Sequence, residues 1–274
     1  MKKSISKMYE VIWNKYHKAI CSVNFYGNSG SKLFGVTGFK YGNRIITDDI
    51  VYNLKDINKV IIRFYEIDGL KIFKELKFAA KDFRKLLAKK EELRDIGFTY
   101  LLLNEEQVDG LQSLELCSNC EPEIGLQILT IEYQIELNNI GLKPGIISSY
   151  AQNNKGYTMI QYDGFVKPGT NGAPLIDLKT GKVKGIVANK ELYIVKAFKE
   201  MHRIADNNIE KLEQVKGKWT FDEIDPIQVM IVSQNQLMYA AKGFYNHFCV
   251  KVGCALEINY LKDLFDLGRE PDFE

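Results

Sequence analysis

Residues 169–177 read GTNGAPLID, and residues 180–187 read TGKVKGIV. Short apolar runs at 173–177 and 183–188 each follow a glycine-containing turn signal, so the sequence predicts two short strands here. Further short, β-rich runs precede them at even spacing. They lie at 20–26, 32–41, 44–47, 60–65, 96–103, 126–131, 145–149 and 157–163. Such spacing is typical of a sandwich or a barrel.

Helical periodicity flanks this β-rich region. Residues 5–16 place apolar side chains three and four positions apart, which predicts an amphipathic helix near the N-terminus. The pattern turns helical again after Tyr193, and residues 227–261 are mostly apolar. Because disordered tails have few apolar residues, we expect an ordered element at this end of the chain.

The composition excludes several classes of function. The chain has 274 residues, of which 46% are hydrophobic and 26% charged, as in ordinary globular proteins. A net charge of +2 gives no overall field to attract nucleic acid, and no apolar run is long enough for a membrane-spanning helix. The count of five cysteines is odd and fits a disulfide framework poorly, and the N-terminus lacks a secretory apolar segment. We therefore expect a cytoplasmic protein that binds neither nucleic acid nor membranes.

The stretch at 169–187 resembles the nucleophile region of trypsin-like serine proteases, especially the bacterial Deg type, which reads GNSGGPL and then GKVVGI. The residues before it agree as well. Residues 160–169 resemble the IQTDAxIxPG run of that family, and residues 145–148 resemble its GIIS strand. Three matches in the same order connect the C-terminal half of the chain with this family.

The N-terminal half resembles the same family. Residues 35–39 are similar to its GxGF strand, residues 44–51 to its ILTNHHV histidine strand, and residues 95–98 to its DLAL aspartate motif. The resemblance implies a mainly β fold with two antiparallel six-stranded β-barrels, an N-terminal helix and a C-terminal, mostly helical extension. The expected parts are the helix at 1–19, the first barrel at 20–112, the second barrel with its following helix at 113–212, and the extension at 213–274.

The resemblance also assigns the catalytic positions. In this chemistry a hydroxyl attacks a carbonyl, an imidazole takes its proton and a carboxylate orients the imidazole. Asn171 stands at the serine position, and its amide nitrogen is not nucleophilic because the lone pair is delocalised. Ile50 stands at the histidine position and accepts no proton. Only Asp95 keeps the family's residue type. We expect no catalytic residue, and hence a pseudoprotease.

Such a chain could still bind a protein or peptide and act as a regulatory module. Backbone amides of Gly169 and Asn171 would form a nest similar to an oxyanion hole. Protease crevices hold peptides as an added strand, and this recognition uses main-chain groups. We therefore expect Gly169, Thr170, Asn171, Gly185 and Val187 to border a binding groove.

Two other functions stay open. Thr170 carries a hydroxyl one residue before the serine position, so a hydrolase with an unorthodox site is one alternative. In the other, the barrels are a scaffold and the function lies in residues 213–274, which could also join copies of the chain into a homo-oligomer.

Cysteines and histidines offer weaker signals. A zinc site built from Cys117, Cys120, Cys249 and Cys254 is geometrically conceivable. The two pairs are far apart in the sequence and the second spacing is unusual, so we expect no metal and no cofactor. None of the histidines lies in a recognised catalytic context; they are His17, His202 and His247.

Overall fold

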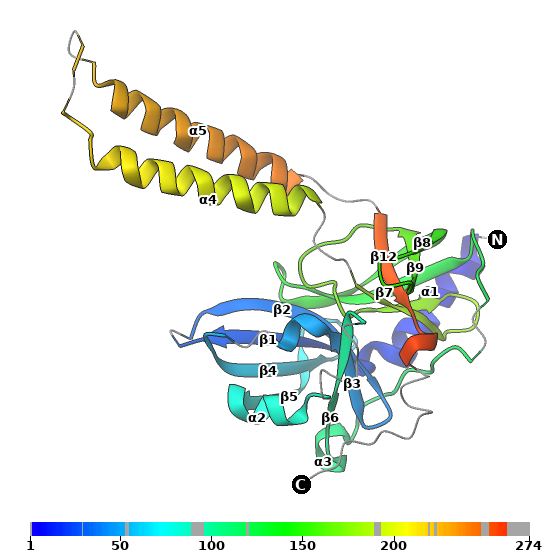
Figure 1. Ribbon diagram of the computed structural model, residues 1–274. Coiled ribbons are helices and arrows are strands. Elements are labelled where there is room, and N and C mark those ends of the chain that lie inside the picture. Colours follow the sequence, from blue (N-terminus) through cyan, green and yellow to red (C-terminus); the bar gives the residue numbers. More distant parts are fainter. Residues whose placement is uncertain are drawn as a thin grey trace. The chain divides into compact units, whose positions relative to one another are not determined.

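The computed structural model describes residues 2–28, 30–52, 55–88, 96–118, 121–188, 193–218, 220–221, 224–247 and 252–261. Strands dominate these residues and form two sheets, preceded by helix α1 (Lys2–Tyr16) and a short turn, η1 (His17–Ala19) (Figure 1). The mainly β fold and the N-terminal helix predicted from the sequence are confirmed. No helix within the described ranges is long and apolar enough to cross a membrane.

The first six strands form one antiparallel sheet in the order β5-β4-β1-β2-β3-β6. Leu87, which follows helix α2 (Ala80–Leu86), forms an isolated bridge with Leu101 of the edge strand β6. The first predicted barrel is a six-stranded sheet in which no pairing of β5 with β6 is found among the described residues. Its strands are β1 (Ile20–Gly27), β2 (Lys32–Tyr41), β3 (Arg44–Asp48), β4 (Ile57–Tyr65), β5 (Ile72–Ala79) and β6 (Phe98–Leu102).

The remaining strands form a closed barrel in the order β10-β11-β12-β9-β8-β7. The chain enters it after helix α3 (Glu105–Val108). The Leu114 amide still bonds to Lys40 of the first sheet, whereas the Cys117 amide bonds to Val183 of the barrel. The strands are β7 (Gln127–Gln134), β8 (Asn139–Gln152), β9 (Thr158–Asp163), β10 (Pro174–Asp177), β11 (Val183–Val187) and β12 (Val252–Glu257).

The closing strand β12 corrects the domain boundaries predicted from the sequence. It pairs with β11 through Val187 and Ala255, and with β9 through Gln161 and Cys254, so the second barrel does not end at residue 212. Residues 213–274 are therefore not one extension. The sequence interpretation did not recognise strand β12 within the apolar run at 227–261. Hydrophobic periodicity alone does not separate a short buried strand from a buried helix.

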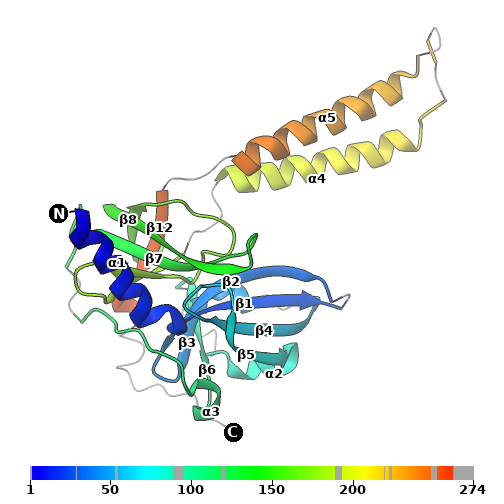
Figure 2. The same cartoon turned by 180° about the vertical axis from the view of Figure 1, so that it is seen from behind.

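A separate unit, Lys190–Val250, lies between β11 and β12 in the sequence. It contains helices α4 (Tyr193–Glu213) and α5 (Pro226–His247), which run side by side in opposite directions (Figures 1 and 2). Ala205 and Ile231 are its most deeply buried described side chains, one from each helix. The unit is thus a helical hairpin inserted into a barrel.

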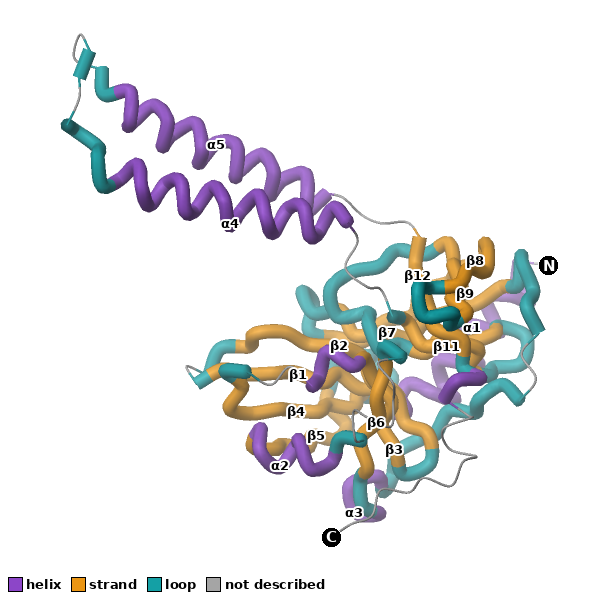
Figure 3. The backbone as a smooth tube through the Cα atoms, viewed as in Figure 1, coloured by secondary structure: helices purple, strands orange, loops and turns teal. Residues whose placement is uncertain are grey.

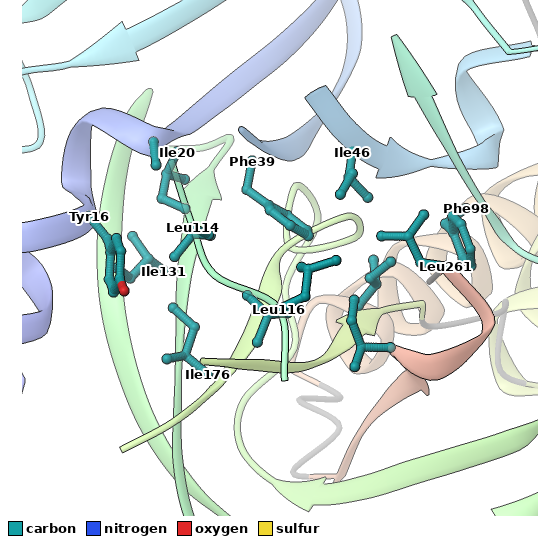
Figure 4. Close-up of a cluster of buried hydrophobic side chains, with 14 of the residues drawn as sticks. Tyr16, Ile20, Phe39, Ile46, Phe98, Leu114, Leu116, Ile131, Ile176 and Leu261 are labelled. Carbon is teal, nitrogen blue, oxygen red and sulfur yellow. The ribbon is translucent and has the colours of Figure 1, made fainter. Parts of the chain in front are cut away.

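One hydrophobic cluster joins α1, the first sheet and the second barrel. It includes Tyr16 from α1, Phe39 and Phe98 from the sheet, and Ile131 and Ile176 from the barrel (Figure 4). Leu261, which follows β12, packs into the same cluster. Because these side chains exclude water together, the sheet and the barrel share one core and hold their junction in place.

Candidate functional site

The loop that leads into β10 carries Asn171 and is held by Thr37 of β2. The Thr37 amide donates to the Asn171 carbonyl at 2.9 Å, and the Thr37 hydroxyl donates to the Gly169 carbonyl at 2.6 Å. The same hydroxyl accepts from the Tyr133 amide of β7 at 2.9 Å. Thr37 is fully buried, so its side chain and backbone connect this loop, the first sheet and the barrel within the protein interior.

Gly172 brings this loop into direct contact with two strands of the first sheet. Its φ is +84°, and a Cβ atom there would lie 2.1 Å from the Thr37 carbonyl oxygen and 2.9 Å from the Asp48 amide nitrogen. Both the backbone conformation and the space require glycine. Asp48 ends β3, so the contact places the Asn171 loop against the end of that strand.

Ile50 follows this contact by two residues. It lies in the turn η2 (Asp49–Tyr52), where its amide donates to the Asp48 carboxylate at 2.8 Å. Its hydrocarbon side chain is 44% exposed. Ile50 and Asn171 therefore lie on the two sides of the junction between the sheets. The third position predicted from the sequence, Asp95, lies outside the described residues.

Thr170 is buried within the loop. It has no exposed surface, and its hydroxyl accepts from the Lys167 amide at 3.2 Å. It also acts on the buried Glu132 carboxylate of β7, whose pKa it lowers. A hydroxyl without exposed surface is not accessible to a substrate, which weighs against Thr170 as an alternative nucleophile.

Glu132 itself is a buried carboxylate beneath the loop. It forms an ion pair with Lys143 of β8 and accepts from the Thr130 hydroxyl at 3.2 Å. Burial, which opposes its charge, raises the pKa of Glu132, although Lys143 and the two threonines partly offset this. The residues that support the loop are thus a polar network inside an otherwise apolar barrel.

Gly185 and Val187 do not border an open groove, which corrects their predicted role. Gly185 pairs with Leu175 on one side and with Glu257 on the other. The Val187 amide donates to the Ala173 carbonyl and the Val187 carbonyl accepts from the Gly172 amide, each at 2.8 Å. The sequence interpretation missed β12 as the second neighbour of β11, because β12 follows only after the hairpin of α4 and α5. Both residues lie within the barrel wall.

Strand β2 has a stretch that β3 does not pair. Thr37 directs both of its backbone polar groups away from β1, since its carbonyl accepts from the Thr47 hydroxyl at 2.7 Å. In an antiparallel pair, residues two apart point the same way, so Gly35 also directs its amide and carbonyl away from β1. Strand β3 pairs with β2 from Gly38 onward and does not reach Gly35. Gly35 is nevertheless buried, and the ring of Tyr133 lies beside it, so this stretch is not an open groove.

Thr37, which holds the Asn171 loop, is a residue of the site that the sequence interpretation missed. The local signal was present, because residues 35–38 read GVTG, with a polar residue between glycines inside a strand pattern. Glycine within a strand often marks a close approach of another backbone. Here Gly38 is crowded by Ile45, and Gly35 by Asn24 and Tyr133.

Other features give no second site. Two hollows of about 370 and 400 Å³ are both lined in part by α1, and neither is lined by residues 169–172. Within the described ranges, no group of three or more His, Cys, Asp or Glu side chains is placed to hold a metal ion. Cys117 is disulfide-bonded, which removes one thiolate from the zinc arrangement considered above, while Cys21 and Cys254 form no disulfide.

A family profile described as "Trypsin-like peptidase domain" matches residues 36–186, more than half of the chain. The chain therefore belongs to the trypsin-like peptidase family. A search of curated proteins gave no match.

Two solved structures of HtrA-type protease are similar to this chain. One is "HtrA-type protease AlgW with tripeptide", with 17% identity, a TM-score of 0.48 and coverage of 65% of this chain and 53% of that chain. The other is a variant of AlgW, also with tripeptide, with 16% identity, a TM-score of 0.49 and the same coverage. The chain thus spans about half the length of these proteases.

Proposed function

We propose that this chain is a non-catalytic member of the trypsin-like peptidase family that binds a protein or peptide and acts as a regulatory module. The observation that carries the proposal is the pair of side chains at the sheet junction. Asn171 occupies the position of the nucleophile and Ile50 that of the general base, and neither can perform the corresponding step. Loss of either group lowers turnover by about 10⁶-fold in a serine protease.

The preserved architecture around Asn171 supports a binding role. Thr37 fixes the loop through the carbonyls of Gly169 and Asn171, not through the Asn171 side chain. The loop therefore keeps its shape without a serine. A surface that retains a defined backbone conformation is suited to recognise main-chain groups of a partner.

The exposed side of the junction is the place where we expect a peptide to bind. Ile50 is 44% exposed there, and its hydrocarbon side chain offers an apolar contact for one side chain of the peptide. An extended peptide would lie next to the loop at 169–172, at the junction that holds the substrate in an active protease.

Catalysis is tested first. We expect incubation with a fluorophosphonate and with peptide esters to give background rates. Labelling that disappears in the Thr170→Ala variant would establish the unorthodox hydrolase instead. Labelling that persists in that variant would locate a nucleophile elsewhere and also contradict the proposal.

Binding is tested by screening an array of extended heptapeptides and following backbone amide signals by NMR. We expect the signals of Ile50 and Asn171 to shift when a selected peptide is bound, whereas the signal of Gly38, within the sheet, should change little. Shifts that are confined to residues around the two hollows on α1 would place the peptide elsewhere and refute the site.

A further inference from the structure

Helix α5 of the inserted hairpin has two apolar faces. The first faces α4 and contains Ile227, Ile231 and Met238, of which Ile231 is only 4% exposed. These residues recur at intervals of four and seven, as expected for one side of a helix packed against another. This face is accounted for by the hairpin itself.

The second face, which we call the outer seam, is exposed. It consists of Met230, Ser233, Leu237 and Ala240, which follow one another at intervals of three, four and three residues. This is the spacing at which one helix packs along another in a coiled coil. Met230 is 50% exposed and Leu237 is 55% exposed, so the described residues leave the outer seam in contact with water.

The two helices of the hairpin differ in their content of charged residues. From Pro226 to Ala241, α5 has no Asp, Glu, Lys or Arg. On α4, by contrast, the exposed residues include Glu200, Arg203, Asp206 and Lys211. A face without charge can meet an identical face without electrostatic repulsion. The polar side of a membrane-surface helix is usually rich in Lys and Arg, which α5 lacks over this stretch.

The outer seam is complementary to itself in size. If two copies of α5 run antiparallel about a two-fold axis at the level of residue 235, Met230 of one copy lies opposite Ala240 of the other. Ser233 then lies opposite Leu237. Each large side chain meets a small one in both halves of the contact, and this alternation allows two helices to pack closely. A two-fold contact requires such self-complementarity.

From this we propose that the outer seam binds the outer seam of a second copy of the chain, so that two hairpins form a four-helix bundle. The bundle resembles other antiparallel assemblies of amphipathic helices, in which a second apolar face on one helix is buried by the neighbouring pair. The inference is independent of the proposed peptide binding, because it involves only residues of the inserted hairpin.

The oligomeric state of the full chain provides the test. We expect sedimentation equilibrium to show a dimer, and the Leu237→Glu variant to raise the dissociation constant at least about tenfold, because the introduced carboxylate would be buried in the contact. The matched control is Tyr239→Glu. Tyr239 is 83% exposed on the same helix, but two residues correspond to about 200° of rotation, so it lies away from the outer seam. This variant should dimerise like the wild type, and both variants should retain the helical signal in circular dichroism.

A size exchange tests the antiparallel register. Ala240→Met alone should weaken the dimer, because two methionines would then oppose each other. Adding Met230→Ala to it should restore dimerisation, since each large residue again meets a small one. A wild-type chain that stays monomeric at about 100 µM would overturn the proposal. So would a dimer that Leu237→Glu leaves intact, one that Tyr239→Glu weakens equally, or a size exchange without recovery.

Discussion

The Thr37 amide donates to the Asn171 carbonyl across the junction of the two sheets, at 2.9 Å. Through this bond, the first sheet holds the backbone of the residue at which the second barrel would carry a nucleophile. The side chain of residue 171 takes no part in the bond. The loop can therefore exchange serine for asparagine without losing its support, which separates the architecture of the site from its chemistry.

Thr37→Val should destabilise the protein strongly. Valine keeps the shape but removes the hydroxyl, so the Gly169 carbonyl and the Tyr133 amide lose a partner in the interior. Two unpaired buried groups correspond to a loss of about 2–4 kcal/mol in the free energy of unfolding, measured in urea. Thr37→Ser, the control, keeps the hydroxyl and should cost only about 1 kcal/mol for the lost methyl group. Equal losses in the two variants would contradict the assigned role of the hydroxyl.

Gly172→Ala should cost about 3 kcal/mol or more, because the added Cβ would overlap the Thr37 carbonyl and the backbone would be held at positive φ. Gly42 gives a matched comparison. Its φ is +59° and a Cβ added there would meet no atom within 4 Å, so Gly42→Ala should cost only about 1–2 kcal/mol. Thermal and urea unfolding of both variants check the difference, and a similar loss at the two positions would count against the close contact of the loop with β2.

Glu132→Gln should alter how stability depends on pH. Burial raises the pKa of Glu132 in the folded state above its ordinary value of about 4.3. A carboxyl with a raised pKa stabilises the fold most when protonated, and this contribution is lost as the pH rises through the folded-state pKa. Glutamine cannot titrate. The free energy of unfolding of the wild type minus that of the variant should therefore fall as the pH rises above about 4.3 and through the folded-state pKa. A rise over this range would mean that the ion pair with Lys143 outweighs burial.

Restoring the reacting groups tests the junction itself. Asn171→Ser alone should show background labelling by a fluorophosphonate, because the isoleucine at position 50 cannot take the proton. Adding Ile50→His should raise the labelling rate at least about tenfold, a small part of what a well-placed general base contributes. We expect the rate to stay well below that of active proteases, because Thr170 and Ala173 differ from the family's turn and small misplacements are costly. A double variant no faster than the single one would falsify the juxtaposition of positions 50 and 171.

Much of the fold could be predicted from the sequence, because it follows from local sequence patterns. The strand–turn–strand stretch from Gly169 to Val187 and the amphipathic helix near the N-terminus both depend on residues close together in the chain.

What the sequence did not provide is the pairing of distant segments. The neighbour of β11 is β12, which follows only after a complete helical hairpin, so Gly185 and Val187 looked like an edge. Likewise, the contact of Thr37 with the Asn171 loop joins residues more than 130 positions apart, and such contacts depend on how the two sheets pack rather than on local sequence.

The insertion of Lys190–Val250 between the last two strands has a consequence for how the protein folds. Barrel closure must wait until the ribosome has delivered β12, and a flexible connection of this length would oppose closure through its entropy. Helices α4 and α5 need only local contacts to form, and as a hairpin they bring the start of α4 beside the end of α5 (Figure 3). The chain then closes a gap of a few residues instead of a long loop, which saves roughly 1–2 kcal/mol of closure entropy. A hairpin that folds first would thus hasten the completion of a barrel to which it contributes no strand.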